Sequence, residues 1–132
     1  MGVAPGETFE SARAEFEAVV AQAAAQDVWL RDHSPEVEWW GGRFLSARTP
    51  SDHPLVSTVR GAASDVTGRE APLEGVTYGA DMGLIANIGE TPAVLFGAGD
   101  IRVAHRPDEY VEIEDLVTMV RTLAVAAMRF CG

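Results

Sequence analysis

Apolar side chains recur every three or four residues near the start of this 132-residue chain, and this stripe predicts a helix from Phe9 to about Gln26. Thr8 can cap the first turn, and Glu10 suits the positive end of the helix dipole. The stripe comprises Phe9, Ala12, Phe16, Val19, Val20 and Ala23.

The same spacing predicts three further helices. One begins at Pro54, a residue that suits the first turn of a helix, and ends near Gly68. A short one spans Met82–Asn87, which Asp81 can cap. The strongest pattern runs from Glu112 to about Phe130, where apolar residues alternate with charged ones at helical spacing.

Three segments between these helices have the patterns of β-strands. Residues 36–44 alternate, so that Val37 and Trp39 share one face and the intervening side chains share the other. Residues 75–78 predict a short strand. The continuous apolar run 92–96 predicts a strand that is buried on both faces. Helices that alternate with buried strands indicate an α/β fold with parallel strands.

A cluster of turn-forming residues at 49–54 predicts a linker between two structural units. Residues 1–50 supply one helix and one strand, and residues 51–132 supply the remaining elements. Both strand-to-helix turns of the second unit, at 78–81 and 96–111, should open on the same edge of its sheet. Ligand-binding groups gather at that edge in open α/β sheets.

The composition excludes two classes of partner. A formal net charge of −10 argues against nucleic acid and against an anionic membrane surface. No run of residues has the length and apolarity of a membrane span. Cys131 is the single cysteine, so no disulfide can form within the chain, and together with the lack of a secretion signal this predicts a cytoplasmic location.

His105 is the leading candidate for chemistry, because it lies in the loop that follows the 92–96 strand. A neutral imidazole suits zinc, cobalt or manganese, and a nearby carboxylate can orient its ring. The acids that are close enough in sequence to do so are Asp100, Asp108 and Glu109. The alternative is an ordinary surface-loop histidine, since no companion ligands lie at metal-binding spacing.

The two turns contain further candidates for substrate binding. Gly97 and Gly99 can let the backbone approach a ligand and offer amide groups to an anion, or they can simply form a tight turn. Asp81 either caps the short helix or lines a pocket beside Gly97. His33 and His53 lie beside prolines in connecting segments and are expected to be solvated.

Six motifs follow one another between Asp27 and Val111, and the resemblance that they carry together covers essentially the whole chain. They are Asp27–Leu30, Pro35–Phe44, Asp52–Leu55, Tyr78–Gly83, Pro92–Asp100 and Ala104–Val111. Together they resemble the C-terminal end of the acetylornithine deacetylase, succinyl-diaminopimelate desuccinylase and aminoacylase family of metallohydrolases. The resemblance implies that residues 1–50 are the back half of a lid or dimerisation domain. Residues 51–132 would then close the catalytic domain, as part of a three-layer α/β/α sandwich.

The resemblance also implies a chemistry. Two metal ions would activate water and polarise the amide of a small N-acyl amino acid or peptide-like substrate, with acetyl, formyl and succinyl groups all open. His105 would hold one ion, and Gly97 to Gly99 would meet the substrate carboxylate. The other ligands and the general-base glutamate have no counterpart here. We therefore expect no hydrolase activity and no tight metal binding from this chain alone.

The unpaired apolar faces of such a chain predict self-association into a homo-oligomer. The alternative to a hydrolase portion is a non-catalytic α+β assembly module. It would pair through the helix near Phe16 and the strand that contains Trp39.

Overall fold

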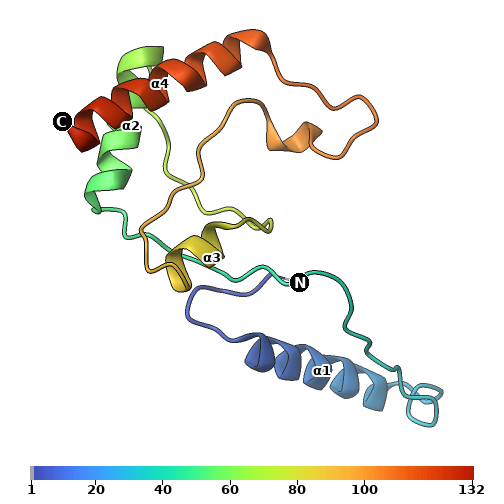
Figure 1. Cartoon of the computed structure of the whole chain (residues 1–132). Coiled ribbons are helices and arrows are strands. Elements are labelled where there is room, and N and C mark those ends of the chain that lie inside the picture. Colours follow the sequence, from blue (N-terminus) through green and yellow to red (C-terminus); the bar gives the residue numbers. More distant parts are fainter. Residues whose placement is uncertain (1) are drawn as a thin grey trace.

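The computed structural model describes residues 2–132, which form four α-helices and one short 3-10 helix joined by long irregular segments (Figure 1). All four helices predicted from the apolar spacing are confirmed. In chain order the elements are α1 (Phe9–Gln26), α2 (Pro54–Thr67), α3 (Met82–Asn87), η1 (Ile101–Val103) and α4 (Ile113–Cys131).

Local side-chain hydrogen bonds explain where α1 begins. The Thr8 hydroxyl accepts a hydrogen bond of 3.0 Å from the backbone N–H of Ser11, and the Ser11 hydroxyl accepts one of 3.2 Å from the backbone N–H of Thr8. This reciprocal capping box satisfies two N–H groups that a helix start leaves without partners. The cap predicted at Thr8 is therefore confirmed.

The start of α2 differs from the expectation for His53. Its Nδ1 accepts a hydrogen bond of 3.1 Å from the backbone N–H of Leu55, so the imidazole caps the helix and is only half exposed. The helix ends at Gly68, whose φ of 70° is the left-handed conformation that glycine adopts at low cost. His53 is a structural cap, and the expectation that it is solvated was wrong.

The packed core lies between α2 and α4, which cross each other at one end of the molecule (Figure 1). The buried side chains are small. From α2 they are Val56, Ala62 and Ala63, and from α4 they are Thr122 and Ala126. Small residues let two helix backbones approach closely, which is how these helices form a core without large aromatic groups.

Residues 2–132 contain no β-strand, so the three predicted strands are absent from the part of the chain described, and the three-layer sandwich is not shown. The segment 36–40 keeps its alternation, since Val37 and Trp39 are half-buried between exposed neighbours. In the run 92–96, Leu95 is 43% exposed and Phe96 is 38% exposed, so burial on both faces was also wrong. A parallel strand exists only when neighbouring strands take its backbone hydrogen bonds, and the described segments supply none of these ladders.

The helix α1 lies apart from α2 and α4, and the segment 42–53 runs from its end of the molecule towards α2 (Figure 1). Trp39 attaches the 36–40 segment to α1. Its ring centroid lies 5.6 Å from that of Phe16 in an edge-on arrangement, and its Nε1–H donates a hydrogen bond of 2.7 Å to Glu17. The Arg13 guanidinium lies 5.0 Å from the same ring. This cluster joins α1 to the 36–40 segment.

Within residues 2–132, none of the helices combines the length and the apolar character that crossing a bilayer requires.

Candidate functional site

His105 occupies the third position of a type II turn in the loop before α4. Ala104 has φ −59° and ψ 139°, His105 has φ 63°, and the Arg106 N–H donates a hydrogen bond of 3.3 Å to the Val103 carbonyl. This turn places its third residue in the left-handed region, which glycine and asparagine favour. The side chain of His105 is exposed. The imidazole therefore lies at the tip of a tight turn and is open to a ligand.

A second turn brings Glu109 back onto His105. The Glu109 N–H donates a hydrogen bond of 3.1 Å to the Arg106 carbonyl, and Pro107 occupies the second position of this turn, where its fixed φ fits. The Glu109 carboxylate then accepts a hydrogen bond of 2.9 Å from the His105 backbone N–H. The Glu109 carboxylate thus contacts His105 as expected, but it binds the His105 backbone and not the imidazole ring.

Asp100, the second acid expected near the imidazole, is engaged by Arg102. Its carboxylate accepts hydrogen bonds from the Arg102 guanidinium at 2.8 and 2.9 Å and from the Arg102 backbone N–H at 2.9 Å. The guanidinium, and then the backbone N–H, lower the pKa of Asp100 from 3.8 to about 2. The same contact raises the pKa of Arg102. This ion pair caps η1 and stiffens the stretch between Gly99 and His105.

Asp108, the third of these acids, is exposed on the turn between His105 and Glu109. Among the hydrogen bonds of residues 2–132, its carboxylate takes part in none. Its neighbour Glu109 therefore supplies the carboxylate that fixes this part of the loop.

Gly97 and Gly99 line a cavity of about 570 Å³ between the end of α2 and the start of α4. Gly99 has φ 84°, and a Cβ added to it would lie 3.3 Å from a methyl group of Val111. Both the backbone conformation and the space therefore favour glycine at this position. Gly97 has open space around it, so a ligand can reach its backbone.

Asp81 occupies the N-cap position of α3, but its side chain makes no capping hydrogen bond. It is exposed and, among the residues described, lines neither the Gly97 cavity nor the second cavity described next. The structure thus does not bring Asp81 together with Gly97 in one cavity.

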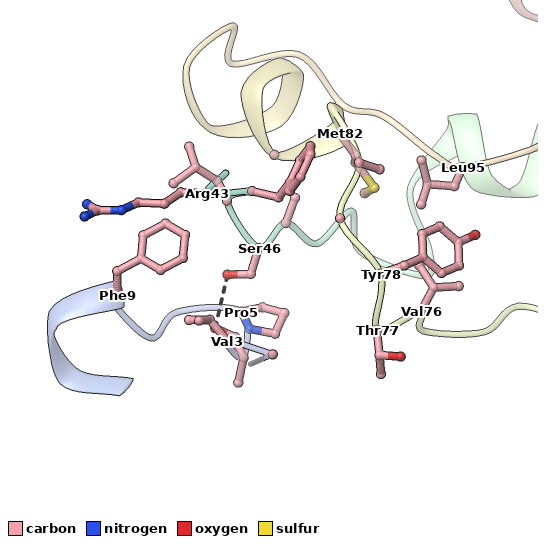
Figure 2. Close-up of a pocket in the computed structure, with 18 of the residues that line it drawn as sticks. Val3, Pro5, Phe9, Arg43, Ser46, Val76, Thr77, Tyr78, Met82 and Leu95 are labelled. Carbon is pink, nitrogen blue, oxygen red and sulfur yellow. Dashed lines mark hydrogen bonds between the residues drawn. The ribbon is translucent and has the colours of Figure 1, made fainter. Parts of the chain in front are cut away.

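The second cavity, of about 470 Å³, lies where three distant segments meet, at residues 2–5, 42–47 and 76–83 (Figure 2). Two of the lining residues are joined by a hydrogen bond of 3.2 Å, which the Ser46 hydroxyl donates to the Ala4 carbonyl. A Cβ on Gly79 would lie 2.4 Å from the Phe44 ring, so glycine permits this close approach. This cavity was not predicted from the sequence, because nothing in the glycine pair at 41–42 or in the Tyr78–Gly83 turn indicates that these two segments lie close together in the fold.

The residues described do not form a complete metal site. Nowhere in residues 2–132 do three histidine, cysteine, aspartate or glutamate side chains gather closely enough to hold an ion. The exposed imidazole of His105 fits the role of one ligand by its chemistry and position. The His33 ring, by contrast, stacks on Trp29 at 4.3 Å between centroids, and His53 caps α2.

A family model described as Peptidase family M20/M25/M40 matches residues 3–129. The chain belongs to this family. The match confirms the resemblance drawn from the six motifs, and proteins of the family are generally metal-dependent.

Three curated relatives resemble parts of this chain. An N-formyl-4-amino-5-aminomethyl-2-methylpyrimidine deformylase of Bacillus subtilis is 29% identical over 97% of this chain and 32% of its own length. The deformylase of the same name from Halalkalibacterium halodurans is 27% identical over 96% of this chain and 31% of its own length. An acetylornithine deacetylase of Myxococcus xanthus is 48% identical over 45% of this chain and 15% of its own length.

The chain therefore spans about a third of the length of the deformylases that it matches. No solved structure matches it.

Proposed function

We propose that this chain is the C-terminal portion of a metal-dependent hydrolase that cleaves the amide bond of an N-acyl amino acid or a similar small molecule. The family match over residues 3–129 supports this assignment, as do relatives named as a deformylase and a deacetylase. The structural observation that carries it is the exposed His105 imidazole at the tip of a constrained turn.

In this proposal His105 holds one of two ions of zinc, cobalt or manganese. Such an ion, when bound, polarises the amide carbonyl that is to be cleaved. The backbone at Gly97 and Gly99 binds the substrate carboxylate, and Asp81 lies at the neighbouring turn. Glu109 holds the His105 backbone, Asp100 is paired with Arg102 beside it, and Asp108 supplies negative charge on the adjoining turn. The remaining ligands and the general base come from residues outside this chain.

The same proposal assigns residues 1–50 to the lid or dimerisation domain and residues 51–132 to the catalytic domain. Residues 75–78 and 92–96 would become strands of an α/β sandwich once neighbouring strands take their backbone hydrogen bonds. Exposed Leu95 and Phe96 would then be covered. A cytoplasmic location remains a prediction that rests on the lone cysteine.

Complementation tests this proposal directly. The chain is co-expressed with the part of the Bacillus subtilis deformylase that precedes the matched region, and the complex is assayed on N-formyl and N-acetyl substrates with added Zn²⁺ or Co²⁺. We expect amide hydrolysis only when both polypeptides are present. His105→Ala should abolish it, and His33→Ala, which removes another exposed histidine, should leave it intact. Activity that survives His105→Ala would contradict the proposal.

A second candidate is self-association through the outer face of α4, a different surface from the Phe16 helix and the Trp39 segment that the sequence suggested. Apolar side chains recur there at spacings of three, four and seven residues, which place them along one side of the helix, and they remain exposed. They are Ile113, Leu116, Val120, Leu123 and Phe130. Two copies of α4 packed against each other would bury both stripes.

Light scattering with two surface variants tests whether α4 is the interface. Val120→Glu should convert a dimer into a monomer if α4 is a homodimer interface, whereas Arg121→Glu on the same helix should not. A stable monomer of the native chain at micromolar concentration would exclude the assembly module.

A further inference from the structure

We propose that Glu109 is a positioning residue for His105: its carboxylate binds the His105 backbone N–H and holds that residue left-handed, which fixes the direction of the Cα–Cβ bond from which the imidazole projects. The inference rests on the proposed function, in which this imidazole is a metal ligand. It assigns to Glu109 a role through the backbone, in place of the expected contact with the ring.

The first argument is the conformation of His105 itself. Its φ of 63° places it in the left-handed region, which a residue with a Cβ adopts only at a cost in free energy. A type II turn favours glycine at this place, and this chain has histidine there. A residue held against its preference needs surrounding contacts that enforce the conformation, and such residues cluster at functional sites.

The second argument is that the enforcing contact is identifiable. The Glu109 carboxylate lies 2.9 Å from the His105 nitrogen, and a charged acceptor makes this a stronger bond than a neutral one would be. Two consecutive turns, closed by bonds of 3.3 and 3.1 Å to the carbonyls of Val103 and Arg106, bring the carboxylate there. Pro107 stiffens the second turn. Two hydrogen-bonded turns thus span the four-residue separation of His105 and Glu109.

The consequence concerns the direction of the side chain. The bond from Cα to Cβ points along a direction set by the backbone dihedrals, so a relaxation of His105 to negative φ would swing the imidazole away from its present direction. A ligand must be held close to its productive geometry before an ion binds well. Glu109 therefore prepares the loop for metal binding without touching the ion.

Nuclear magnetic resonance of the ¹⁵N,¹³C-labelled chain tests this contact without any metal. Glu109→Ala should speed hydrogen exchange of the His105 amide by about tenfold, the effect of losing one charge-assisted hydrogen bond. It should also lower the order parameter of the His105 ring. Glu109→Gln keeps a carbonyl acceptor and should restore most of both values. Asp108→Ala, the adjacent acid without a bond, is the matched control and should change neither.

Unchanged amide exchange and ring order in Glu109→Ala would overturn the inference. Equal effects in Asp108→Ala would overturn it too, because they would reflect the charge of the loop and not this bond. A Co²⁺ titration of the complex with the preceding part of the deformylase tests the proposed function separately. If His105→Ala leaves Co²⁺ binding unchanged there, the metal role fails, whereas the exchange result still decides whether Glu109 fixes the turn.

Discussion

Arg129, near the end of α4, reaches across 64 positions of the chain to Asp65 on α2, and its Nη2 lies 2.6 Å from the Asp65 Oδ2. The two side chains are 46% and 62% exposed, so water and salt screen their attraction. The pair joins the two helices that form the core, but its strength is that of a surface ion pair.

Arg129→Ala should therefore lower the free energy of unfolding by less than about 1 kcal/mol. The measurement is urea denaturation followed by circular dichroism, at low salt and again at high salt. The small loss should shrink further at high salt because the pair is exposed. A loss of several kcal/mol would mean that this contact, and not apolar packing, holds α2 against α4.

Thr122 is fully buried between the same helices, and its hydroxyl has no hydrogen-bond partner among the residues described. Burying an unpaired hydroxyl costs free energy, and valine has nearly the same shape without it. Thr122→Val should therefore raise the free energy of unfolding by about 1 kcal/mol. Thr118→Val, on a half-buried part of the same helix, is the control and should have a smaller effect. A destabilised Thr122→Val variant would show that the hydroxyl is hydrogen-bonded after all.

Trp39 and Trp40 offer a matched pair for testing how α1 is held. Trp39 packs edge-on against Phe16 and donates to Glu17, whereas Trp40 is 91% exposed. Trp39→Ala should lower the free energy of unfolding of the part that contains α1 by about 2 kcal/mol, because aromatic packing and one hydrogen bond are lost. Trp40→Ala should change it by less than about 0.5 kcal/mol. Circular dichroism at the helix minimum measures both; equal effects would contradict the assigned packing of Trp39.

The ion pair between Asp100 and Arg102 predicts a specific pH dependence. Because the folded pKa of Asp100 is lowered from 3.8 to about 2, its contribution to stability is full above pH 3.8. It is lost as the pH falls through about 2. The ¹³C shift of the Asp100 carboxyl should titrate near pH 2, and Arg102→Gln should move the midpoint up towards 3.8. A midpoint near 3.8 in the native chain would show that the pair does not form in solution.

The helices could be predicted from the sequence because their determinants are local. Thr8 and Ser11 lie three residues apart, and Gly68 ends α2 through its own backbone freedom. The three strands predicted from the apolar patterns do not form in residues 2–132, because a strand such as 92–96 depends on neighbours distant in sequence. The type II turn at His105 also escaped prediction. A glycine at the third position is the usual sequence signal of a type II turn, and this chain has histidine at that position.

The affinity of this chain alone for Zn²⁺ should be low. His105 is a single exposed imidazole, and residues 2–132 gather no cluster of three ligands around it or elsewhere. A closed zinc site needs three or four protein ligands, so calorimetric titration with Zn²⁺ should reveal no nanomolar site. His105→Ala should leave the weak residual binding nearly unchanged, since other exposed acids contribute to it. Nanomolar binding that His105→Ala abolishes would mean that copies of the chain assemble a site between them, with His105 as a shared ligand.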